Sequence, residues 1–139
     1  MEEELPGLAR DLVTTCARMI RWIPTEELPL SLAATRLLAR LDENGPSRVS
    51  DLAEKERSSQ PTITNHIKRL EAQGLVARTA DPDDRRAWRI AVTERGQDQL
   101  SNARQVMANN ITPDLARLTT TDRAALVKGI AAMHKLMAL

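Results

Sequence analysis

The amino-acid sequence predicts a mainly α-helical chain with a small β-hairpin of two or three strands between its helices. Apolar residues recur at three- and four-residue steps over most of the chain, which is the spacing of one helical face. Residues 75–93 break this pattern with two short β-compatible runs. With 139 residues, the chain has room for one compact domain, or for one domain with an added oligomerisation element.

The first two predicted helices flank a break that contains two prolines. From Leu5 to Ile23, apolar residues at positions 5, 8, 12, 16, 19 and 23 form a continuous stripe. The second helix is expected to begin after Ser31, a good N-cap, and to end at Asn44-Gly45-Pro46. Both helices are therefore predicted to be amphipathic.

The next two predicted helices differ in length and in polarity. A helix of one or two turns is expected from Val49 to Lys55. A longer helix begins at Ser58-Ser59-Gln60-Pro61, where the first turn tolerates proline, and ends before Gly74. Its apolar stripe is narrow, so most of its circumference is polar. The polar positions are Thr62, Thr64, Asn65, Lys68 and Arg69.

The last third of the sequence predicts a hairpin followed by two helices. Strands are expected at 75–79 and 87–93, with Trp88 as the residue that anchors the hairpin in the core. A long helix follows, and Pro113 is expected to kink or end it because proline lacks an amide donor. Thr121 is predicted to cap a final helix that is too apolar for a lone surface helix. The methionines of this region, Met107, Met133 and Met137, indicate interface packing.

Composition excludes several classes of function. Cys16 is the single cysteine, so an internal disulfide and a multi-cysteine metal site are excluded and a reducing, cytoplasmic location is favoured. We expect no metal and no cofactor, because the two histidines and five glycines lack the spacing of zinc or phosphate motifs. The acidic start and the lack of a long apolar run predict no export and no membrane span. An enzyme is not expected, because no nucleophile with a base and an orienting acid is recognisable.

The order of the central elements is that of a winged helix-turn-helix, which places a polar helix in the DNA major groove and a hairpin in the neighbouring minor groove. Short polar side chains of the helix can bond base edges or phosphates, Pro61 fixes its start, and its two cations suit backbone phosphates. The candidate DNA-contacting residues on this helix are Ser59, Gln60, Pro61, Thr62, Thr64, Asn65, Lys68 and Arg69. His66 either contacts phosphate or packs beneath the helix.

The charged hairpin tip supports the same interpretation. Arg85 and Arg86 are consecutive cations on a loop, a form that can enter a narrow, electronegative minor groove. Asp84 either orients the Arg86 guanidinium or forms an acidic turn with Asp83. A winged helix that docks another protein is the alternative from a different class, but it does not require paired exposed arginines.

Residues 59–76, which read SQPTITNHIKRLEAQGLV, together with Asp81-Pro82-Asp83-Asp84-Arg85-Arg86 and Val92-Thr93-Glu94-Arg95-Gly96, resemble the MarR family of bacterial transcription regulators. The resemblance implies a homodimer with interlocked terminal helices that binds a pseudo-palindromic double-stranded DNA operator. Residues 30–93 would form the winged helix-turn-helix domain, and residues 1–29 and 94–139 the helical dimerisation region.

The resemblance also implies a repressor that is released by a small aromatic or phenolic acid, or by oxidation of a cysteine. For such an acid, the candidate residues are Arg18 and Arg21 beside Leu30 and Thr35, with solvation or pairing to nearby glutamates as the alternative. Cys16 is interpreted first as a small core residue, and otherwise as a redox or alkylation sensor. The absence of tyrosine counts against peroxide sensing.

Overall fold

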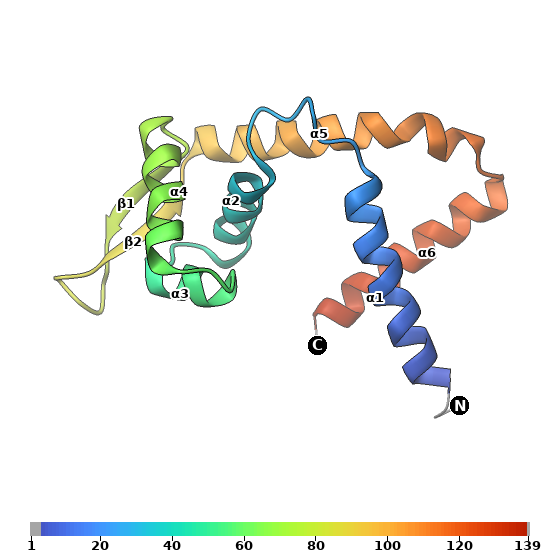
Figure 1. The fold of residues 1–139 in the computed structure, drawn as a ribbon, viewed down its shortest axis with the longest axis horizontal. Helices are drawn as coiled ribbons and strands as arrows, with labels where there is room; N and C mark the ends of the chain where they lie inside the picture. The colour runs from blue at the N-terminus through green and yellow to red at the C-terminus, as the bar shows by residue number, and fades with distance from the viewer. Residues whose placement is uncertain (1–3, 139) are drawn as a thin grey trace. The chain divides into compact units, whose positions relative to one another are not determined.

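The structure is a computed structural model that describes residues 4–138. Six helices and two strands lie in this range (Figure 1). In chain order they are α1 (Glu4–Trp22), α2 (Leu32–Asn44), α3 (Val49–Lys55), α4 (Gln60–Ala72), β1 (Val76–Ala80), β2 (Trp88–Val92), α5 (Glu94–Arg117) and α6 (Thr120–Met137). The predicted mainly helical class with a small hairpin is therefore confirmed. None of the helices within residues 4–138 is long and apolar enough to cross a membrane.

The chain divides into two compact units: residues 25–106, and the two terminal segments that precede and follow them. Helices α2, α3 and α4, the hairpin and the start of α5 share the core of the first unit. Its largest fully buried side chains are Leu37, Leu38, Leu41, Leu52, Ile67, Leu70, Leu75, Ile90 and Leu100. Helix α5 contributes residues to both units.

Local capping explains where the helices of this unit begin. The Ser31 hydroxyl accepts a hydrogen bond from the amide of Ala34, and the Ser59 hydroxyl accepts one from Thr62, both at 3.2 Å. Pro61 lies in the first turn of α4. Gly45 and Gly74 have φ values of +74° and +71°, which glycine adopts without strain where α2 and α4 end.

The hairpin pairs β1 and β2 in antiparallel register, from Val76 opposite Val92 to Ala80 opposite Trp88. Ser47 adds an isolated bridge to Ile90, and the two residues exchange backbone hydrogen bonds of 3.0 and 2.8 Å. Trp88 is 55% exposed, so its predicted role as a core anchor is wrong. It belongs to the outermost strand pair, and the buried residue of β2 is Ile90.

Helix α5 joins the hairpin through a close approach at Gly96. The Thr93 hydroxyl donates to the carbonyl of Gly74 at 2.6 Å and accepts from the amide of Gly96 at 3.1 Å. A Cβ atom at residue 96 would press against the carbonyl oxygen of Leu75 and lie 2.7 Å from Cγ2 of Val92. Glycine is therefore required here for the helix to meet the strand.

Of the two outcomes expected at Pro113, a kink or an end, the end does not occur: helix α5 continues to Arg117, because proline removes only its own amide from the hydrogen-bond ladder. The predicted cap of the last helix needs correction. Thr119, and not Thr121, caps α6: its hydroxyl accepts from the amide of Asp122 at 3.1 Å, the N-cap to N3 spacing.

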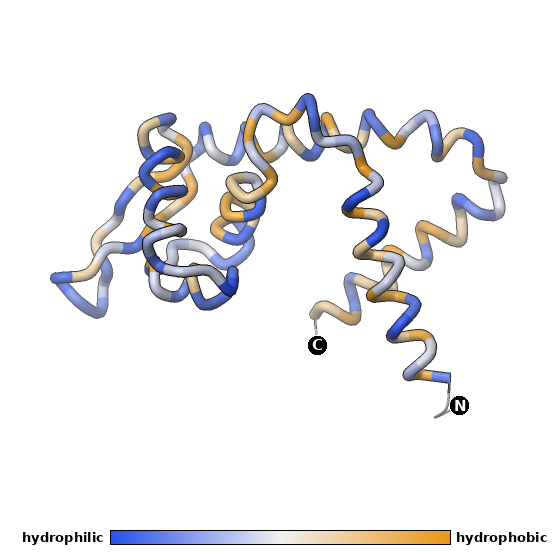
Figure 2. Tube along the Cα trace, in the orientation of Figure 1, coloured by the Kyte–Doolittle hydropathy of each residue, from blue (hydrophilic) through white to orange (hydrophobic). Residues whose placement is uncertain are grey.

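The terminal helices keep apolar faces in solvent. No described residue of α1 or α6 is buried, although both helices alternate hydrophobic and hydrophilic positions along their length (Figure 2). Leu8, Ile20, Val127 and Ile130 are all more than half exposed. Cys16 is also exposed, so its interpretation as a buried core residue does not hold in the single chain. Periodicity indicates that a face is apolar, but not what covers it.

Candidate nucleic-acid interface

Helix α4 presents polar side chains opposite a buried apolar edge. Ile63, Ile67 and Leu70 are at most 4% exposed and fasten the helix to the core. Most of the predicted contact residues are exposed on the remaining circumference, whereas Thr64 and His66 are half-buried. The exposed ones are Ser59, Gln60, Pro61, Thr62, Asn65, Lys68 and Arg69. No acidic residue occurs from 60 to 70, so this surface can approach a polyanion without repulsion.

Ser59 has a structural task as well. Its hydroxyl accepts from the Thr62 amide and shares a 2.8 Å hydrogen bond with the Thr62 hydroxyl. These contacts hold the first turn of α4 in place. Pro61 has no amide proton, and the amide of Ile63 donates to the carbonyl of Ser59 at 3.1 Å, so these contacts leave the amide of Gln60 available to a phosphate oxygen.

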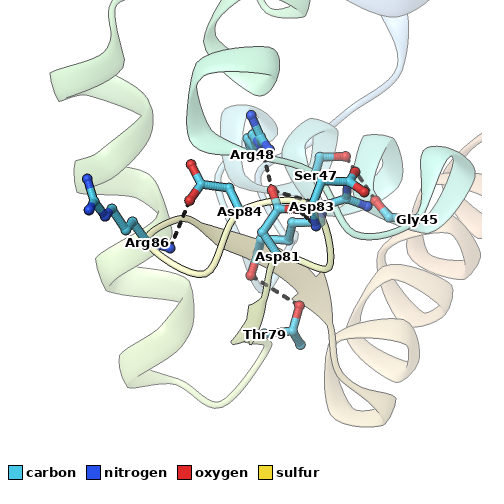
Figure 3. Close-up of polar contacts among 9 residues, drawn as sticks. Gly45, Ser47, Arg48, Thr79, Asp81, Asp83, Asp84 and Arg86 are labelled. Atoms are coloured by element: carbon cyan, nitrogen blue, oxygen red, sulfur yellow. Dashed lines mark hydrogen bonds and ion pairs between the residues drawn. The ribbon is translucent and has the colours of Figure 1, made fainter.

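The wing, defined as β1, β2 and the connecting residues 81–87, presents Arg85 and Arg86 at its exposed tip. The carboxylate of Asp84 accepts a 2.9 Å hydrogen bond from the backbone amide of Arg86 (Figure 3). The Arg86 side chain extends away from that carboxylate (Figure 3). Of the two interpretations of Asp84, the structure therefore supports the acidic turn, and not an oriented guanidinium.

The sequence does not reveal a buried carboxylate that directly follows β1. Asp81 is 3% exposed, and its Oδ2 atom forms ion pairs with Nε of Arg48 and, at 3.4 Å, with Nε of Arg89. Its Oδ1 accepts from the amide of Asp83 at 2.9 Å (Figure 3). These three residues, Arg48, Asp81 and Arg89, are called the Asp81 ion cluster below. Only the Asx-turn position of Asp81 is visible in the sequence, because Arg48 precedes it by 33 residues.

The hydrogen bond from Arg48, followed by that from the Asp83 amide, holds the pKa of Asp81 well below its usual range. The same contact raises the pKa of Arg48. The cluster is therefore charged at every physiological pH. It joins Arg48, which precedes α3, to Asp81, which follows β1.

A second ion pair between a helix and the hairpin is exposed. Nε of Arg78 on β1 lies 3.2 Å from Oε2 of Glu71 at the end of α4, and both side chains are about 40% exposed. Such a pair contributes little to stability because water screens it.

The predicted effector residues lie in different units. Arg18 and Arg21 line an open groove of about 600 Å³ on α1 together with Thr15, Met19 and Trp22. Leu30 packs against the core of the central unit. Thr35 is 8% exposed there, and its hydroxyl lacks a hydrogen-bond partner among the described residues.

Comparison with known sequences identifies related proteins. A family model described as MarR family matches residues 30–88. The chain is 30% identical over 118 residues to the HTH-type transcriptional regulator Mb0904 of Mycobacterium bovis, covering 84% of this chain and 82% of that protein. It is 26% identical over 105 residues to the HTH-type regulator YdgJ of Bacillus subtilis, covering 76% of this chain and 64% of YdgJ. It is 32% identical over 76 residues to the HTH-type transcriptional repressor MdtR of Bacillus subtilis, covering 52% of this chain and 49% of MdtR.

The chain thus spans 64% of YdgJ and 49% of MdtR. Among solved structures, a MarR family protein from Bacillus stearothermophilus matches with a TM-score of 0.70 and 22% identity, covering 100% of this chain and 99% of that chain. This likeness shows the fold. The matched relatives are regulators and not enzymes. The long alignment with Mb0904, together with the family model over the central unit, shows that the chain belongs to the MarR family of transcriptional regulators.

Proposed function

We propose that this chain is a homodimeric, cytoplasmic repressor that binds a pseudo-palindromic double-stranded DNA operator and is released from it by a small aromatic acid. One observation carries the DNA-binding part. The polar surface of residues 60–70 of α4, which include no acidic residue, and the paired arginines of the wing tip belong to the same compact unit. A helix and a hairpin of this kind suit a major groove and its neighbouring minor groove.

The roles of the side chains follow from their chemistry. Thr64 and Asn65 bond base edges and so supply sequence preference, since short amides and hydroxyls match the donor and acceptor pattern of the major groove. Lys68 and Arg69 bind phosphates, and Arg85 and Arg86 enter the minor groove. Arg86 therefore contributes affinity that depends on salt more than on sequence.

Residues 30–93 form the DNA-binding domain in this proposal, and residues 1–29 and 94–139 form the dimerisation region. The exposed apolar faces of α1 and α6 support this division, because an isolated helix gains nothing from such a face in water. A two-fold dimer would present two copies of α4 to two operator half-sites, about 34 Å apart for one helical turn.

The sign of regulation and the effector class rest on separate observations. MdtR, a relative over 76 residues of the chain, is named a repressor. The α1 groove combines two arginines with an indole ring, a lining that suits a carboxylate attached to an aromatic ring. Its volume, about 600 Å³, is within the usual range for small-molecule sites. Cys16 is exposed on the same helix, which favours oxidation of this thiol as a second candidate signal.

The test is a fluorescence-anisotropy titration of the protein against duplexes from the region upstream of its own coding sequence, at two salt concentrations, with and without salicylate. Preference over scrambled duplexes, lost on addition of salicylate, would support the whole proposal. Preference that salicylate leaves intact would support the DNA-binding part and refute this effector. Equally weak binding to every duplex would refute DNA recognition and favour the protein-docking alternative.

A further inference from the structure

The Asp81 ion cluster connects the end of β1, where the wing tip begins, to the start of α3. Its carboxylate is fully buried, whereas Arg48 and Arg89 keep 39% and 30% of their side chains exposed. A buried carboxylate is stable only when it is paired and hydrogen-bonded, and Asp81 meets both conditions through Arg48, Arg89 and the Asp83 amide. The cluster therefore fixes the spacing between elements that are distant in sequence.

The wing is fastened along β2 and at the end of β1, and its tip extends beyond these two points. The Ser47–Ile90 backbone bridge holds the middle of β2, and the Asp81 ion cluster holds the residue that follows β1. Beyond these points, the described hydrogen bonds and ion pairs of residues 82–86 stay within the hairpin: Asp84 with Arg86 and Ala87, and Asp83 with Asp81 and Arg89. The direction of the tip consequently depends on the anchor at Asp81.

A lever estimate shows why the anchor at Asp81 matters. Three residues of extended chain, the separation of Asp81 from Asp84 in the turn, reach about 10 Å, so a tilt of about 10° at Asp81 moves the turn by about 2 Å. A productive contact tolerates about 0.5 Å. An isolated two-stranded hairpin is too weak to resist such a tilt alone.

We infer that Asp81 is a positioning residue for DNA binding: by holding Arg48 and Arg89, it sets the wing at the angle from which Arg85 and Arg86 reach the minor groove. Asp81 itself does not contact DNA. This inference rests on the proposed function, and it adds that the affinity contributed by the wing tip depends on a buried carboxylate that lies away from the DNA surface.

The test is a double-mutant cycle with the full-length protein and a duplex that the wild-type protein has selected from a random-sequence pool. The variants are Asp81→Asn, which keeps the shape and removes the charge, Arg85→Ala/Arg86→Ala, which removes both cations of the tip, and the three substitutions combined. We expect Asp81→Asn to weaken binding about tenfold, close to the loss from Arg85→Ala/Arg86→Ala, since both remove the same minor-groove contacts. In the Arg85→Ala/Arg86→Ala background, Asp81→Asn should cost less than about twofold. Losses that multiply would overturn the inference.

Glu71→Gln is the matched control, because it breaks an exposed ion pair that also joins α4 to the hairpin. It should leave affinity within about twofold of the wild type. Circular dichroism at the assay temperature establishes that each variant is folded. A shorter duplex without the flanking minor-groove steps adds a second readout: Asp81→Asn and the wild type should bind it equally.

The two levels of the argument fail differently. If the wild-type protein selects no sequence from the pool, the proposed function is refuted. If the wild type selects and binds a sequence but folded Asp81→Asn binds it equally well, only the positioning role of Asp81 is refuted.

Discussion

Replacing Gly96 by alanine tests the joint between the wing and α5. The added Cβ would lie 2.7 Å from Cγ2 of Val92, whereas carbon atoms pack best at about 3.5–4.0 Å. It would also press against the carbonyl oxygen of Leu75. That carbonyl cannot turn aside freely, because it accepts a 3.0 Å hydrogen bond from the amide of Thr93.

The cost follows from these two contacts. Overpacking in a close-packed site costs about 1–3 kcal/mol, and a weakened backbone hydrogen bond adds about 1 kcal/mol. We expect the free energy of unfolding to fall by about 3 kcal/mol. For a unit of this size, that lowers the unfolding temperature by roughly 12–24 °C.

The assay is thermal unfolding followed by circular dichroism, at a matched protein concentration. Gly7→Ala is the control, because no atom lies within 4 Å of the added Cβ and alanine favours a helix over glycine. Its unfolding temperature should stay the same or rise. If Gly96→Ala unfolds within about 3 °C of the wild type, the close approach of α5 to the strand does not constrain the fold as argued.

Three further predictions concern function, pH and assembly. Arg86→Ala should weaken DNA binding for all sequences and flatten the salt dependence of binding. Asn65→Ala should reduce the binding free energy for the preferred sequence by about 1–3 kcal/mol and relax sequence preference. Equal loss of preference in both variants would contradict this division. Folding lowers the pKa of Asp81 from 3.8, so the ionised carboxylate stabilises the fold fully above that pH and progressively less as the pH falls below it. The difference in unfolding temperature between the wild type and Asp81→Asn should therefore shrink between pH 6 and pH 3. A constant difference would show that the charge is not the cause. Ile130→Asp puts a charge on the apolar face of α6 and should prevent formation of the proposed dimer, which light scattering would show as the mass of a monomer; a dimer mass that the substitution leaves unchanged would place the interface elsewhere.

The elements that local chemistry determines were predictable from the sequence. Ser31 caps its helix as expected, because a cap depends on residues three positions apart. Ser59, in the run where the next long helix is predicted to begin, caps α4 in the same way. The hairpin strands are within one residue of their predicted bounds. Thr119 was missed in favour of Thr121 because the run Thr119-Thr120-Thr121 offers three equivalent hydroxyls, and only the fold determines which one meets a free amide.

The Asp81 ion cluster shows what the sequence could not reveal. Aspartate before proline is common in turns, and no local pattern sets Asp81 or Arg48 apart from ordinary loop residues. Their pairing depends on the wing folding back to the segment before α3, which no local pattern records. The exposed polar surface of α4 and the charged tip were therefore predictable from the sequence, but the residue that holds the tip in place was not.

Cys16, Trp88 and the apolar face of α6 were all expected to be covered, and all three are exposed in the single chain. They differ in what can cover them. Trp88 belongs to the outermost strand pair, where the central unit has no core left to receive it. Cys16 and α6 belong to a terminal unit in which no described residue of α1 or α6 is buried, so a surface outside that unit is needed to remove their apolar neighbours from water. If a second copy supplies that surface, the dimer that positions two α4 helices on DNA is also the source of stability for the terminal helices, and any signal that loosens α1 acts on both.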